Sequence, residues 1–168
     1  MRRLFAISLA ALALAVPAVA AEPPGPSAVV EALDQACRLY VKNDDYDGYK
    51  AKAEELGIKD FFGTLVRRAP GVDIFAIGAT ADAPFARSCT IAIDGPPALV
   101  EQTPAAIAAW AKANGFKPDG APATLTNDDG NPYGRTLWKG PKARLQMNTH
   151  AAKPNGRANV AVIWSVAN

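Results

Sequence analysis

The chain has 168 residues, of which 49% are hydrophobic and 20% are charged, so it is long enough for one domain around one hydrophobic core. Its formal net charge of +2 comes from residues 1–21, which contain Arg2 and Arg3 but no acidic residue. The rest of the chain is formally neutral and lacks the surplus of Lys and Arg that nucleic-acid binding requires, which excludes that class of partner.

The N-terminal segment predicts export from the cytoplasm. Two arginines precede a nearly continuous apolar stretch over residues 4–16, and Pro17 and the small residues 18–20 follow. This order is typical of a secretory signal peptide, and the apolar stretch is too short for a membrane span. We expect a signal peptide over residues 1–21, a periplasmic or secreted mature protein, and no membrane anchor after cleavage.

The segment that follows the signal peptide predicts helices. After a flexible, proline-rich lead-in over residues 22–27, a single globular domain is expected over residues 28–168. Apolar residues recur at helical spacing from Val29 to Val41, which predicts a first helix that ends at a polar run. A second helix is expected to end at Gly57. A short third helix is predicted from the spacing of Phe61, Phe62, Leu65 and Val66.

The polar run between the first two helices has the spacing of a metal-binding loop. The stretch "NDDYDGYKAKAE", residues 43–54, resembles the calcium loop of EF-hand proteins, with Gly48 at its sharp turn. The resemblance implies calcium ligation by Asn43, Asp45, Asp47, the Tyr49 carbonyl and Glu54. The same residues also fit a plain polar turn between two helices, in which Glu54 is a surface residue. Calcium is the one candidate cofactor.

Strands dominate the rest of the chain, interrupted by one clear helix. In the stretch "QTPAAIAAWAKANGF", Thr103 fits the N-cap, Pro104 the first helical position and Gly115 the residue after the end. Strands are predicted at residues 72–80, 87–93, 133–139, 142–150 and 157–166. The order lacks a regular alternation of strand and helix, so we expect an α+β fold with an antiparallel sheet of about five strands and helices packed on one face.

The two cysteines lie far apart, at Cys37 on the first helix and Cys89 on the second strand. In an exported chain this pair predicts a disulfide, which joins the first helix to the sheet. The closed loop of about 50 residues stabilises the fold by roughly 4 kcal/mol in the chain-entropy model.

The strand "KARLQMNTH" alternates strictly between apolar and polar side chains. In an antiparallel sheet covered on one side, the polar members face water and are available to a partner. We interpret this face as the binding surface for an envelope protein or a glycan, with Trp138 as a natural anchor if it joins the polar side. The candidate residues are Arg135, Trp138, Arg144, Gln146, Asn148 and His150.

Catalysis has little support in the sequence. His150 is the only histidine, and no serine lies in a nucleophile-elbow motif. The preferred hypothesis is therefore a small, exported, non-catalytic binding protein, such as an envelope accessory or inhibitor protein. A calcium-binding domain and a small hydrolase that uses His150 are the alternatives.

Overall fold

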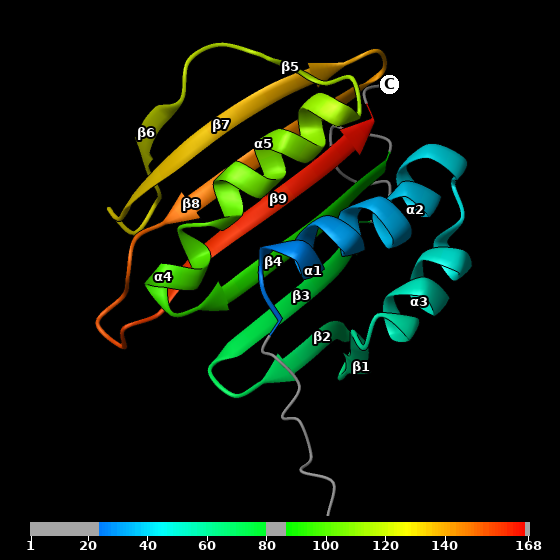
Figure 1. Cartoon of the computed structure of the whole chain (residues 1–168), viewed down its shortest axis with the longest axis horizontal. Helices are drawn as coiled ribbons and strands as arrows, with labels where there is room; N and C mark the ends of the chain where they lie inside the picture. Colours follow the sequence, from blue (N-terminus) through cyan, green and yellow to red (C-terminus); the bar gives the residue numbers. More distant parts are fainter. Residues whose placement is uncertain (1–23, 80–86, 167–168) are drawn as a thin grey trace, which may run out of the picture.

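The computed structural model describes residues 24–79 and 87–166, and Figure 1 shows helices lying over one face of a large sheet. The predicted α+β fold is confirmed. The predicted signal peptide, residues 1–21, lies outside the described residues. The division of the chain into a leader, a lead-in and a domain stays a prediction, although a helix already begins at Pro26, inside the predicted lead-in.

The helical layer has an N-terminal part and a central part. A helix with a π-helical middle segment runs without a break from Pro26 to Asn43, and a left-handed residue, Asp44 at φ 60°, separates it from the next helix. None of the helices within the described ranges is long and apolar enough to cross a membrane. The helical elements are α1 Pro26–Glu31, η1 Ala32–Cys37, α2 Arg38–Asn43, α3 Tyr46–Glu55, α4 Pro97–Val100 and α5 Thr103–Ala113.

The strands pair antiparallel throughout the described residues, and they form one nine-stranded sheet. Their spatial order is β1-β2-β3-β4-β9-β8-β7, and the outer side of β7 pairs with both β5 and β6. The strands are β1 Lys59–Phe61, β2 Thr64–Ala69, β3 Val72–Ala79, β4 Arg87–Gly95, β5 Lys117–Pro118, β6 Ala123–Thr126, β7 Pro132–Gly140, β8 Ala143–His150 and β9 Ala158–Val166.

The five long predicted strands are β3, β4, β7, β8 and β9, and the prediction missed four shorter ones. The predicted third helix is wrong, because Phe61–Val66 belongs to the β1–β2 hairpin. Phe62 (φ 51°) and Gly63 (φ 82°) form its turn, and two successive left-handed residues are characteristic of a two-residue hairpin loop. The turn reverses the chain here, so the helical spacing of the apolar residues does not lead to a helix.

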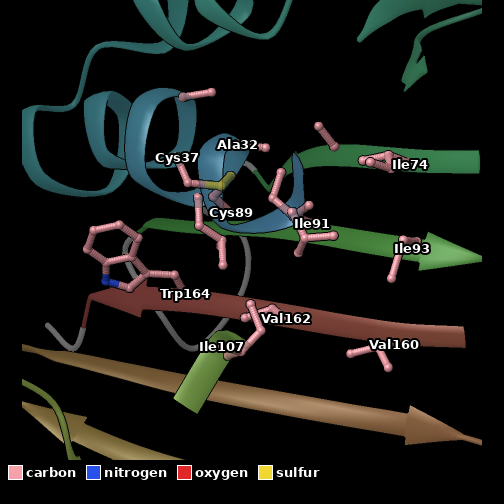
Figure 2. Close-up of a cluster of buried hydrophobic side chains, with 14 of the residues drawn as sticks. Ala32, Cys37, Ile74, Cys89, Ile91, Ile93, Ile107, Val160, Val162 and Trp164 are labelled. Carbon is pink, nitrogen blue, oxygen red and sulfur yellow. A yellow bond between two sulfur atoms is a disulfide. The ribbon is translucent and has the colours of Figure 1, made fainter. Parts of the chain in front are cut away.

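The core lies between the helices and one face of the sheet, which we call the covered face. Alternate residues of β4 and β9 point into it, as Figure 2 shows for Ile91, Ile93, Val160 and Val162. The opposite face, which no described helix covers, is called the open face. The two-residue period of each strand assigns neighbouring side chains to different faces.

The predicted disulfide between Cys37 and Cys89 is confirmed, with a distance of 5.6 Å between the two Cα atoms. It joins the end of η1 to the covered face of β4 (Figure 2). Both cysteines are fully buried, so the bond lies within the core rather than on the surface. The N-terminal helix is thereby fixed to the middle of the sheet.

A second link joins the N-terminal helix to α5. The Asp34 carboxylate accepts hydrogen bonds from Arg38 and from Trp110 Nε1, the latter over 3.1 Å. Arg38 also donates to the Asn114 amide oxygen over 2.8 Å. Burial alone raises the pKa of Asp34, but the bonds from Arg38 and Trp110 hold that pKa below its usual value. The two helical segments therefore form one connected layer.

Candidate functional site

The predicted polar face of β8 lies on the open face of the sheet. Arg144, Gln146, Asn148 and His150 alternate with the buried Leu145 and Met147 of the covered face. The register also brings Arg135 of β7 beside Asn148. The strict alternation in the sequence therefore identified these side chains correctly as the side of β8 that faces away from the core.

A recess of about 250 Å³ lies on this face, over β7, β8 and β9. Four of the predicted residues border it, namely Arg135, Trp138, Arg144 and Gln146, and four other lining residues were missed, Ser165 among them. Its lining includes Arg135, Arg144 and Gln146, together with Asp119, Leu137 and Ile163. We call this group of six residues the open-face recess.

The strand register explains how the open-face recess forms. Leu137, Gln146 and Ile163 lie in one row across β7, β8 and β9, and the two aliphatic side chains give the recess an apolar floor. The backbone N–H of Asp119 donates to the Leu137 carbonyl over 2.9 Å, which places Asp119 at the end of this row. The Gln146 amide donates to the Asn148 side-chain oxygen over 3.0 Å.

The two arginines are the main electrostatic feature of the recess. Arg135 is half-buried and Arg144 is exposed. Five ion pairs occur among the described residues, and none of them includes either arginine. Both guanidinium groups thus keep their fork of N–H donors available, and this fork matches carboxylate, sulfate and phosphate oxygens in bidentate geometry.

Trp138 is not an anchor on this surface, so that part of the prediction is wrong. Its side chain is only 6% exposed and lies on the covered face, where it pairs with Leu145. The strand period supplies the reason, because residues three apart in a regular strand point to opposite faces. Arg135 and Trp138 therefore cannot share one face of β7, although both border the recess.

His150 lies at the other end of β8, about 20 Å from Arg144 at about 3.3 Å per residue. Its ring stacks on Tyr133, with centroids 5.4 Å apart and planes inclined by 22°. Within residues 24–79 and 87–166 it makes no hydrogen bond to a carboxylate or a hydroxyl group. The serines Ser88 and Ser165 are buried, and they pair with each other across β4 and β9. These positions do not assemble a nucleophile with a general base.

The structure does not bring together the residues that the EF-hand resemblance implied as calcium ligands. Asp45 caps α3 and accepts from the Gly48 N–H over 2.8 Å, and Tyr49 is buried against Tyr40 and Tyr46. In the described part of the chain no three acidic, histidine or cysteine side chains gather as metal ligands, so Asp45, Asp47 and Glu54 do not converge. Asn43 ends α2, and the geometry is that of the polar turn.

Comparisons of the chain with models of known protein families, with curated protein sequences and with solved structures found no match. The kind of group that the open-face recess can bind therefore has to be inferred from its lining residues. The two unpaired guanidinium groups outweigh the single carboxylate of Asp119. With an amide pair and a short apolar floor, they form a surface that suits an acidic group with a small apolar attachment.

Proposed function

We propose that this chain is an exported, non-catalytic binding protein that holds an acidic group of an envelope protein or glycan in the open-face recess. The observation that carries the proposal is the convergence of Arg135 and Arg144, neither of which has an acidic partner. The lining supplies N–H donors for binding carboxylate, sulfate or phosphate oxygens.

The size of the recess supports a macromolecular partner. Its volume of about 250 Å³ lies below the range of about 300–1,000 Å³ that is usual for sites enclosing a whole small ligand. A space of this size accommodates one side chain or one sugar substituent. The remaining contacts then come from the broad open face around it, as in ordinary protein–protein interfaces.

Two observations support export. The segment 1–21 has the order of a signal peptide, and the Cys37–Cys89 disulfide is the kind of bond that persists in an oxidising compartment. Expression of the full chain with its leader tests this part. We expect a mature N-terminus near residue 21 and two oxidised cysteines in the exported fraction. An uncleaved chain with two free thiols in the cytoplasm contradicts it.

Binding is tested by capture of partners from an envelope extract with immobilised mature protein. The double variant Arg135→Gln/Arg144→Gln removes both guanidinium groups and keeps polar side chains. Because hydrogen bonds between charged groups contribute about 1.5–3 kcal/mol each, we expect affinity for a captured partner to fall at least about tenfold.

The matched control is Lys59→Gln/Arg68→Gln, which makes the same change of charge at the other edge of the open face. This control should capture the same partners as the unaltered protein. Equal capture by the unaltered protein and by the Arg135/Arg144 variant means that the recess is not the binding site. Equal losses in both double variants mean that only the overall charge matters.

A further inference from the structure

A second cavity, of about 390 Å³, lies on the covered face at the end of the sheet where β9 terminates. We call it the end cavity. It lies beside the C-terminal end of α2, the segment that follows α5, and the turn between β7 and β8. Its volume falls within the range of about 300–1,000 Å³ that is usual for small-molecule sites. It shares no lining residue with the open-face recess.

The inner wall of the end cavity is apolar and largely aromatic. Trp164 and Phe116 pack edge to face with their ring centroids 6.0 Å apart, and Val41 of α2 adds an aliphatic side chain. Trp110 holds Trp164 from behind, with ring centroids 5.3 Å apart. Packed rings of this kind form a rigid wall against which an apolar group can lie.

The rim of the cavity is positively charged. Lys42, Arg87 and Lys142 line it, and the Lys42 ammonium lies 5.7 Å from the centre of the Trp164 ring. The acidic side chain that is paired here is Asp44, which contacts Arg87 over 3.3 Å. The C-termini of α2 and α5 add about half a negative charge each, which leaves a net excess of about one positive charge among the described residues.

Two residues that line this cavity carry a buried hydrogen-bond donor with no acceptor among the described residues. Trp164 is 1% exposed, yet neither its Nε1 nor the Nε of Arg87 has a partner among the described residues. Figure 2 shows the Trp164 ring directed away from Val162, toward the C-terminal end of β9. Buried donors of this kind are normally satisfied, because leaving one unpaired costs free energy. Both groups donate, so a ligand that meets them must supply an acceptor.

The two donors come from neighbouring positions on the covered face. Cys89 pairs with Trp164 and Arg87 pairs with Val166, so Arg87 and Trp164 are diagonal neighbours on the covered face. The Cα atoms of diagonal neighbours are about 7–8 Å apart, within reach of long side chains. Both side chains are therefore long enough to extend toward one shared ligand group.

We propose that the end cavity binds a small organic carboxylate with an apolar body. Its oxygens accept from Trp164 Nε1 and Arg87 Nε, its charge is balanced by the cationic rim, and its apolar part packs against Phe116 and Val41. This site goes beyond the partner surface of the open-face recess and involves different residues.

Calorimetric titration of the oxidised mature protein with decanoate, below its micelle concentration, tests the proposal. We expect one molecule of decanoate per chain and at least tenfold weaker binding of decanol, which lacks the charge. Inorganic phosphate, which lacks the apolar body, should give no comparable binding. Absence of decanoate binding, or equal affinity for decanol or phosphate, overturns the proposal.

The indole donor is tested with two matched substitutions. Trp164→Phe keeps an aromatic ring and removes the orphan N–H, and we expect decanoate affinity to fall about tenfold. Trp138→Phe makes the same change in a buried ring that does not line the end cavity. It should bind decanoate as the unaltered chain does. Equal affinities in both variants, or equal losses, contradict the assigned donor.

A surface variant keeps the proposal testable if Trp164→Phe does not fold. Lys142→Gln removes an exposed charge at the rim, and we expect it to weaken decanoate binding severalfold, with the difference shrinking at high salt. Lys153→Gln, which lies outside this cavity, is the control and should change nothing. Arg135→Gln/Arg144→Gln should also leave decanoate binding intact, so this site and the open-face recess can fail separately. An unchanged affinity in Lys142→Gln contradicts the charged rim.

Discussion

The two faces of the central sheet use the same strands for different purposes. On β4 the covered face carries Ile91 and Ile93, both fully buried, whereas the open face carries the half-buried Thr90 and Ala92. The helices, the disulfide and most of the core lie on the covered side. Most buried apolar contacts therefore lie on one face, whereas the ion pairs of Arg157 with Asp73 and Asp94 lie on the open side.

The open face is itself uneven. Its β1–β3 side carries exposed apolar residues, including Ile77 at 51% exposure, whereas its β7–β8 side carries the charged recess. The covered face is not divided into an apolar part and a charged part in this way. Its buried side chains, including Cys89 and Trp164, belong to one continuous core. Contrasts between the two faces can thus be tested by substitutions at matched positions.

The largest expected effect is loss of the disulfide on the covered face. Cys37→Ala/Cys89→Ala opens a link between residues 52 positions apart, and we expect the free energy of unfolding to fall by about 4 kcal/mol. Chemical denaturation of the oxidised protein and of the double variant measures the difference. A change of less than about 1 kcal/mol contradicts the view that this link dominates the covered face.

Next come two isoleucines on opposite faces of neighbouring strands. Ile91→Ala leaves a cavity in the core, and we expect a loss of about 3 kcal/mol. Ile77→Ala removes the same atoms from a half-exposed position and should cost less than about 1 kcal/mol. Urea denaturation of both variants measures the ratio. Similar losses mean that the open face is covered in solution.

A gain of about 1 kcal/mol is expected from Tyr49→Phe. The Tyr49 hydroxyl is buried with no hydrogen-bond partner among the described residues, so its removal relieves a desolvation cost. Burial also raises the pKa of Tyr49 far above its usual value. Above about pH 10 the unfolded chain loses this proton while the folded chain keeps it. The contribution of Tyr49 to the free energy of unfolding is therefore full below about pH 10 and is lost as the pH rises further. Thermal melts from pH 7 to pH 11 should show the gain and a smaller alkaline loss in the variant. A destabilised variant contradicts the unpaired hydroxyl.

A smaller effect is expected on the stability of the helical layer at acidic pH. Because the pKa of Asp34 is held below its usual value of 3.8, its contribution is present above about pH 4 and is lost as the pH falls below that value. The side chain is 45% exposed, so solvent screening limits the contribution to under about 1 kcal/mol. Asp34→Asn should lower stability at pH 7 and match the unaltered chain near pH 2. Equal stability at both pH values contradicts this role.

The smallest expected effect is on the open face. Arg135→Gln/Arg144→Gln should change the free energy of unfolding by less than about 0.5 kcal/mol, because neither arginine has an ion-pair partner in the described residues. Equilibrium unfolding checks this. A larger loss means that the two arginines stabilise the fold, and it removes the contrast between the faces.

Local patterns predicted the elements well where one structure dominated a segment. The alternation around Gln146 identified the face of β8, and the cap and stop signals at Thr103 and Gly115 located α5 to within two residues. The pattern at Phe61–Val66 misled because apolar residues at helical spacing also fit a hairpin with a tight turn. The alternation of side chains along β7 puts Trp138 opposite Arg135, and the prediction that grouped the two residues did not apply it.

The tertiary sites were beyond local patterns. The open-face recess needs Asp119, which follows the two-residue strand β5 and reaches β7 through a backbone hydrogen bond. The end cavity combines α2, β4, β9 and two turns that are distant in the sequence. No short sequence motif indicates that these elements lie together. The pairing of Arg87 with Val166 across β4 and β9 brings their ends to the same place. The disulfide was the exception, because two cysteines suffice to specify one contact.

Both margins of the sheet are formed by very short strands, with three residues in β1, two in β5 and four in β6. The nine-residue strand β7 is occupied along its outer side by β5 and β6, so it offers little free backbone to an incoming chain. Recognition by strand addition is therefore disfavoured, as is the edge-to-edge stacking that leads to fibrils. Concentrated samples of this protein should resist amyloid formation as long as these small flanking strands remain in place.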